Sequence, residues 1–223
     1  MTRLSLVALL SGALALTGFT GLPALQGELV YVLGDVSVRQ RGAPVEARIG
    51  MLLGPGDVIE TGADGTAVLR LGSDAELKLR ENTLLALDSL GEEPQVNLSR
   101  GGLFSRVTAR LAGRFRVVTE TAVAGVRGTE FFVAYGRRID EYPDIWLCVN
   151  EGSVEVAILG TGRRLVVDEG LGINIVGGVK LTPPRPYRWT RKLNWNADPL
   201  RGEVSDRTDL EQAYSDLLDQ DYD

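Results

Sequence analysis

The chain has 223 residues, of which 44% are hydrophobic and 24% charged, and this composition is typical of a globular protein rather than a disordered one. It carries a net charge of −6 and no histidine, which excludes a Ser-His-Asp triad and removes the commonest metal ligand. Its single cysteine, Cys148, excludes an intramolecular disulfide and a cysteine metal cluster. The apolar neighbours of Cys148 predict a buried strand residue, and an intermolecular disulfide is the alternative.

Residues 1–26 have the pattern of an export signal. Arg3 precedes an apolar stretch from Leu4 to Leu16, which is shorter than the roughly 20 apolar residues that span a bilayer. Ala13 and Ala15 offer signal peptidase small residues at the required spacing. We therefore expect a signal peptide and a periplasmic or other extracytoplasmic envelope location. An uncleaved N-terminal anchor, which would be the only membrane contact, and a buried helix are the alternatives.

Residues 27–180 predict an all-β domain. Apolar residues recur at every second position, as in Ala67, Leu69 and Leu71 or Ala75, Leu77 and Leu79. The residues between them, Val68, Arg70, Glu76, Lys78 and Arg80, are expected on the solvent face of the sheet. The 27 glycines include turn signals at 54–57, 62–65, 160–162 and 177–178.

The domain also contains an internal echo. The segment Gly34–Val38 resembles Gly152–Val156, Gly54 and Gly172 lie at the same offset, and Leu98–Phe104 is a looser third copy. Each reads as an apolar strand, a glycine turn and another apolar strand, which suits stacked β units. Chance similarity between hairpins is the alternative.

Beyond residue 180 the composition changes. The prolines of Thr182–Tyr187 exclude a central strand, so 181–202 is read as an extension that leaves the domain. This extension supplies the candidate partner-binding residues, Arg185, Tyr187, Arg188, Trp189, Arg191 and Trp195. Packing on the β domain, cation–π pairs and attraction to the acidic end are the alternatives, and we predict that part of 187–195 docks on the domain. Export and the net charge of −6 argue against nucleic acid as the partner.

The last segment, 203–223, has eight acidic residues and one basic residue. Thr208 and Glu211 form a capping box before apolar residues at helical spacing, which predicts a short helix with a frayed end. We expect this acidic tail to be detachable, so that deleting 203–223 leaves the melting temperature unchanged.

Several short motifs carry structural signals. Gly56-Asp57 and Thr61-Gly62 suit tight turns at the two ends of a short strand. Gly128 is expected to have a positive φ or to touch a neighbouring backbone, and Thr129 to bond a local backbone group. Arg127 is expected to pair with Glu130 or to face solvent, and the alternative is that it binds an anionic ligand.

These motifs occur in an order that resembles the extracytoplasmic domain of the FecR family. The matching segments are Gly34–Val36, Leu53–Gly62, Leu98–Leu103, Val126–Phe131 and Glu151–Val156. The resemblance implies that Gly56, Asp57, Thr61, Gly62, Val126, Arg127, Gly128, Thr129, Phe131 and Gly152 are structural motif residues. It also implies a twisted β-solenoid-like roll with a sensing or scaffolding role.

Family members that regulate iron uptake carry a cytoplasmic anti-sigma segment and a transmembrane helix before this domain. An export signal at the start of the chain leaves no room for that segment, so we do not expect anti-sigma activity. We predict a non-catalytic envelope module, without cofactor or metal, that binds a protein or glycan partner in signalling or assembly. A structural scaffold and a carboxylate-dependent hydrolase of envelope polymers are the alternatives.

Overall fold

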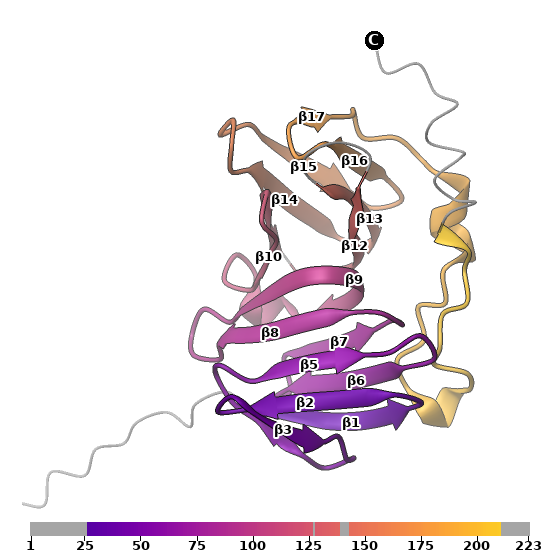
Figure 1. Ribbon diagram of the computed structural model, residues 1–223. Coiled ribbons are helices and arrows are strands. Elements are labelled where there is room, and N and C mark those ends of the chain that lie inside the picture. Colours follow the sequence, from indigo (N-terminus) through magenta and orange to yellow (C-terminus); the bar gives the residue numbers. More distant parts are fainter. Residues whose placement is uncertain (1–25, 127, 139–142, 211–223) are drawn as a thin grey trace, which may run out of the picture.

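The computed structural model describes residues 26–126, 128–138 and 143–210 (Figure 1). The predicted signal peptide, Arg127 and the predicted helix after residue 210 lie outside the described residues. Within the described ranges no helix is long and apolar enough to cross a bilayer.

The described chain is built from β-strands arranged in two sheets, which confirms the all-β prediction. The first sheet contains, in spatial order, β4 (Leu52–Leu53), β1 (Gly27–Leu33), β6 (Thr66–Leu71), β7 (Ala75–Leu79), the second half of β9 (Gln95–Val107), β12 (Glu130–Arg138), β13 (Pro143–Glu151), β16 (Gly172–Val176) and β17 (Lys180–Leu181). The second contains β3 (Ala43–Glu46), β2 (Val36–Gln40), β5 (Val58–Thr61), β8 (Leu84–Ser89), the first half of β9, β10 (Arg116–Val118), β11 (Ala122–Val126), β14 (Ser153–Ile158) and β15 (Arg164–Asp168). Three 3₁₀ helices, Ala109–Leu111, Arg188–Lys192 and Pro199–Arg201, complete the described elements.

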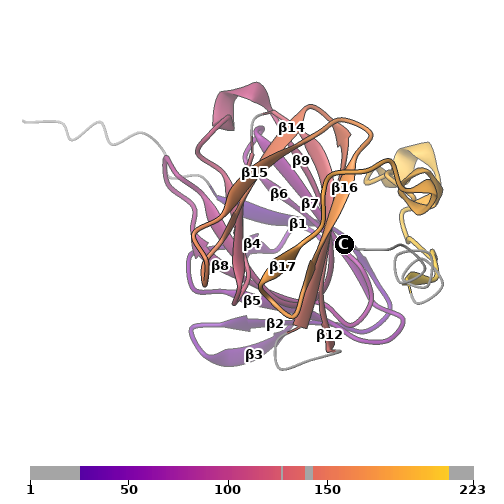
Figure 2. The same ribbon diagram turned by 90° about the horizontal axis from the view of Figure 1, so that it is seen from above.

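The two sheets face each other across one core. Leu29, Leu69 and Leu77 of the first sheet pack in the same cluster as Ile59 and Leu85 of the second, and all five are fully buried. Figure 2 shows the strands of both sheets around this shared interior. Since alternate residues point inward, the period-two pattern of the sequence builds the inner face of each sheet.

Strand β9 joins the two sheets because it bends. Its first half pairs with β8 and β10, and its second half pairs with β7 and β12. The bend is at Gly101, whose φ is 94° and where a Cβ atom would lie 2.3 Å from the Thr83 hydroxyl oxygen. The loose third copy of the sequence echo, Leu98–Phe104, therefore marks the passage from one sheet to the other.

The main echo corresponds to a repeated four-strand unit at the two ends of the stack. At one end β1 pairs with β4 and continues through a glycine corner into β2, which pairs with β3. At the other end β13 pairs with β16 and continues through a second corner into β14, which pairs with β15. The corner glycines, Gly34 and Gly152, have φ values of 66° and 80°. The resemblance between the segments thus reflects equivalent structure rather than chance.

The predicted solenoid-like roll is not confirmed. Neighbouring strands of the described chain pair in antiparallel fashion, except for the parallel pair β9–β10. Stacked coils of a parallel β-helix would instead place parallel strands side by side. The hairpins and glycine corners reverse the chain at each layer, so two facing antiparallel sheets result.

Candidate binding site on the outer face of the first sheet

An extended segment, residues 182–210, crosses the outer face of the first sheet, and we call it the C-terminal strap (Figure 1). Tyr187, Leu193 and Trp195 pack on an aromatic surface of that sheet, and further along Ala197 and Val204 cover Val68. The aromatic surface consists of Phe104, Phe132, Trp146 and Cys148. The prediction that part of 187–195 docks on the domain is confirmed.

Lys78 anchors the strap to the sheet. Its ammonium group donates hydrogen bonds to the carbonyl oxygens of Asn196 at 2.9 Å and Val204 at 3.1 Å, and to that of Asn194. The same Nζ atom lies 4.1 Å from the centre of the Phe104 ring. Burial lowers the pKa of Lys78 to about 8, since desolvation disfavours the charged form. The side chain is only 1% exposed, so its predicted place on a solvent face is wrong.

Arg80 makes a second buried contact with the strap. Its Nη2 atom donates to the Thr208 carbonyl at 2.9 Å and to the Glu81 carboxylate at 2.7 Å. Arg80 is 4% exposed, yet its Nε and Nη1 atoms have no hydrogen-bond partner among the described residues. The stem of Arg80 crosses Gly102, where a Cβ atom would lie 2.9 Å from the Arg80 Cδ atom. The solvent-face prediction is wrong for Arg80 as well.

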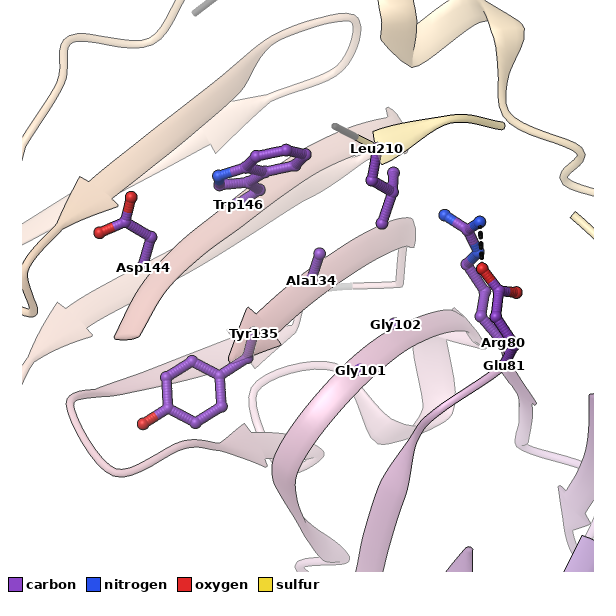
Figure 3. Close-up of a pocket in the computed structure, with 9 residues that line it drawn as sticks. All are labelled: Arg80, Glu81, Gly101, Gly102, Ala134, Tyr135, Asp144, Trp146 and Leu210. Atoms are coloured by element: carbon purple, nitrogen blue, oxygen red, sulfur yellow. Dashed lines mark hydrogen bonds and ion pairs between the residues drawn. The ribbon is translucent and has the colours of Figure 1, made fainter. Parts of the chain in front are cut away.

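A pocket of about 130 Å³ opens beside Arg80, between the first sheet and the end of the strap (Figure 3). Its walls are the glycine pair of the β9 bend, four apolar or aromatic side chains, two carboxylates and Arg80. The lining residues are Arg80, Glu81, Gly101, Gly102, Ala134, Tyr135, Asp144, Trp146 and Leu210. A small apolar pocket with a few polar groups on its wall is the form that binding sites commonly take.

The two carboxylates of this pocket do not form a catalytic pair. Glu81 is engaged with Arg80, and Asp144 accepts a hydrogen bond from the Gly177 backbone N–H at 2.8 Å. Figure 3 shows Glu81 and Asp144 at opposite ends of the pocket. In the part of the chain that the structure describes, no group of three acidic, cysteine or histidine residues is placed to hold a metal ion.

Cys148 lies in the aromatic surface beneath the strap. It is fully buried and free, as expected for a small strand residue, and burial raises the pKa of its thiol. Burial also denies a second molecule access to the sulfur, so the alternative of an intermolecular disulfide is not supported.

The candidate partner-binding residues of the extension do not form one exposed surface. Tyr187 and Trp195 point toward the sheet, and the ring of Trp195 lies edge-on to Phe104 with 5.2 Å between ring centres. The backbone of Arg185 exchanges two hydrogen bonds with Gly172 of β16. Arg188 and Trp189 belong to the 3₁₀ helix Arg188–Lys192, and Arg191 is exposed there.

The strap continues past the expected boundary between residues 202 and 203. Val204 and Asp206 are 1% and 4% exposed, and the carbonyls of Val204 and Thr208 are bonded to Lys78 and Arg80. The expectation that the chain becomes detachable at residue 203 is therefore wrong for residues 203–210. The acidic character of this stretch concealed the contact, because two buried cations of the sheet bind its backbone rather than its carboxylates.

The motif residues lie in turns and in the core. Gly56 has a φ of 87°, and the Asp57 carboxylate accepts from the Gly54 N–H at 2.8 Å, which closes the turn before β5. At the other end of β5, the Thr61 hydroxyl accepts from the Thr83 N–H and the Gly62 N–H donates to the Asp35 carbonyl. Val126 and Phe131 are fully buried in the core between the sheets.

Gly128 and Gly152 bring two corners of the chain together. Gly128 has a φ of 61°, as predicted, and a Cβ atom there would lie 3.2 Å from the Ala109 Cα atom. A Cβ atom at Gly152 would lie 2.6 Å from the Gly128 carbonyl oxygen. The Thr129 hydroxyl is buried and has no partner among the described residues, so the predicted hydrogen bond is wrong. Glu130 accepts from Arg106 at 2.6 Å, while Arg127 lies outside the described residues.

Comparison with known proteins relates part of this domain to a known family. Residues 57–155 match the family model described as FecR protein. Two crystal structures of a proposed anti-sigma factor from Parabacteroides distasonis share 18% sequence identity with the chain, at a TM-score of 0.49. The alignment covers 58% of this chain and 59% of the relative, so it spans well under two thirds of the relative's length. No curated protein sequence matches the chain.

Proposed function

Since residues 57–155 match the FecR family model, we propose that the chain is an exported, non-catalytic envelope module that binds a partner protein in a signalling or assembly role. The FecR match supports a signalling-related, non-enzymatic function. The pattern of residues 1–26 supports export.

The pocket beside Arg80 is our candidate for the partner site. The observation that carries this assignment is the pair of unpartnered donors, Nε and Nη1, on an arginine that is almost fully buried. Buried donors without acceptors cost free energy, so an acceptor that enters the pocket stabilises the site. Lys78 and Arg80 already hold backbone carbonyls of the strap, which shows the kind of group that this face binds.

The chemistry of the pocket favours a polypeptide segment as the ligand. A carbonyl or carboxylate oxygen would accept from Arg80, and an apolar side chain would contact Trp146, Ala134 and Leu210. Glu81 partly neutralises Arg80, which reduces attraction for a strongly charged anion and favours the neutral carbonyl of a peptide.

Site-specific photocrosslinking in the native cell tests this function. A photoreactive amino acid replaces Ala134 in the pocket of the full-length chain, and a matched variant carries it at Ala86 on the second sheet. We expect a discrete protein adduct from position 134 alone, in the envelope fraction and on a chain with a trimmed N-terminus. Arg80→Gln should reduce the adduct while the melting temperature shows that the domain is folded.

Three results would contradict the proposal. Equal background at positions 134 and 86 would mean that the pocket binds no partner. An adduct that contains only glycan would replace the protein partner by an envelope polymer. Full-length protein confined to the cytosol would remove the envelope role.

A further inference from the structure

The second sheet ends in an open edge at β15. Among the described strands β15 pairs with β14 alone, so one side of its backbone faces outward. Arg164, Val166 and Asp168 are exposed, and Val166 is 52% exposed although it is apolar. An unpaired strand edge with an exposed apolar residue at its centre is a ready template for a further strand.

The register of β14 and β15 defines which backbone groups point outward. The Ile158 N–H donates to the Arg163 carbonyl at 2.9 Å, so residues 158, 156 and 154 of β14 direct their backbone groups toward β15. On β15, Leu165 pairs with Val156 and Val167 pairs with Val154. Because bonded and non-bonded pairs alternate in an antiparallel ladder, the N–H groups of Arg164, Val166 and Asp168 face away from β14.

The side chains of β15 are complementary to a second copy of the same strand. If two β15 strands run antiparallel about a two-fold axis at Val166, then Val166 lies opposite itself, and Arg164 of each copy lies opposite Asp168 of the other. Arg164, Val166 and Asp168 are also the residues whose backbone groups point outward. The register that forms the interstrand hydrogen bonds is therefore the same register that pairs the complementary side chains. On the core side, Leu165 lies opposite Val167.

The equivalent strand at the other end of the stack lacks these features. Strand β3 is one residue shorter than β15 and carries Pro44 opposite Arg39 of β2. Proline on an edge strand removes an N–H donor and blocks further pairing. Strand β15 contains no proline.

We propose that two copies of this protein associate through antiparallel pairing of their β15 strands, which makes the second sheet continuous across a two-fold dimer. The interface is self-complementary, as two-fold association requires. It involves one short strand from each copy, so the dimer is transient rather than obligate. This inference is independent of the partner site beside Arg80, which lies on the first sheet.

Charge reversal with rescue tests the dimer. Analytical ultracentrifugation of the mature chain at about 100 μM should show dimer, as expected for a Kd in the micromolar range. Arg164→Asp or Asp168→Arg alone places like charges opposite each other in both halves of the interface and should weaken association by about tenfold or more. The double variant restores opposite charges and should recover the dimer.

Val166→Pro provides a second, independent disruption. It removes the central outward N–H and should abolish the dimer, while circular dichroism reports whether the monomer remains folded. A chain that is monomeric at this concentration overturns the proposal. So does a dimer that is insensitive to either single charge reversal, or a double variant that is as weak as the singles.

Discussion

The inner faces of the two sheets pack against one shared core, whereas their outer faces differ in how far they are buried. In the second sheet, strands such as β5, β11 and β14 alternate strictly between buried and partly exposed residues. In the first sheet, β6, β13 and β16 are buried at almost every position, because the C-terminal strap covers them. A sheet can therefore carry aromatic side chains and even a lysine on its outer face when a separate segment of chain supplies the cover and the hydrogen-bond acceptors.

Of the changes that test this difference between the outer faces, removal of the strap should lower the stability of the protein most. A chain that ends after Pro186 exposes Phe104, Phe132 and Trp146 to water, so we expect the melting temperature to fall by about 10 °C or more. A chain that ends after Gly202 loses Val204, whose carbonyl accepts from Lys78, and the Thr208 carbonyl, which accepts from Arg80. It keeps the other two acceptors of Lys78, so its melting temperature should fall by less. An unchanged melting temperature for the shorter deletion would mean that residues 203–210 contribute nothing to stability.

Replacement of the buried Lys78 should have the next largest effect on stability. Lys78→Met keeps the apolar stem but leaves the carbonyls of Asn194, Asn196 and Val204 without their donor. We expect a loss of roughly 1–3 kcal/mol in the free energy of unfolding by urea denaturation. The matched variant Lys192→Met changes an exposed lysine and should be close to neutral. Equal effects of the two variants would contradict an anchoring role for Lys78.

The corner at Gly128 tests the connection between the sheets, because the chain passes there from β11 into β12. Gly128→Val places a β-branched residue at a φ of 61° and close to Ala109, so the domain should lose more than about 1 kcal/mol. Gly162 has a φ of 67° with open space around it, so Gly162→Val measures the conformational cost alone. The Gly128 variant should be the less stable one in chemical denaturation, and the reverse order would refute the close approach.

A pair of valines compares the two outer faces directly. Val68 of the first sheet is fully buried under Ala197 and Val204, whereas Val123 of the second sheet is partly exposed. Val68→Thr buries a hydroxyl and should cost about 1–2 kcal/mol, and Val123→Thr should be nearly neutral. If both changes cost the same in thermal unfolding, the strap does not shield the first sheet from water.

The last expected effect is a pH dependence from Lys78. Its pKa is about 8 in the folded protein and 10.5 in the unfolded chain, so between these values the unfolded chain binds a proton that the folded chain has lost. The free energy of unfolding of the wild type should therefore rise with pH across this window, relative to Lys78→Met. Parallel pH profiles of the two proteins would show that Lys78 does not titrate there.

Much of the fold was predictable from local pattern. Alternation at 67–71, 75–79 and 154–158 identified strands because one face of each sheet always meets the same core. Glycine turns such as Gly54–Asp57 were predictable because few residues other than glycine adopt a positive φ without strain. The echo of Gly34–Val38 in Gly152–Val156 reported a repeated unit, although antiparallel pairing rather than a solenoid was the outcome.

The environment of the outer faces was decided only by the tertiary structure. Lys78 and Arg80 occupy outward positions of a strand pattern, which in sequence is indistinguishable from a solvated face. Their burial depends on residues more than a hundred positions away, and the strap that covers them has no regular periodicity of its own. The sequence therefore determined which residues form strands and where the chain turns, while the contact between two distant segments decided which polar groups are buried and where the pocket beside Arg80 lies.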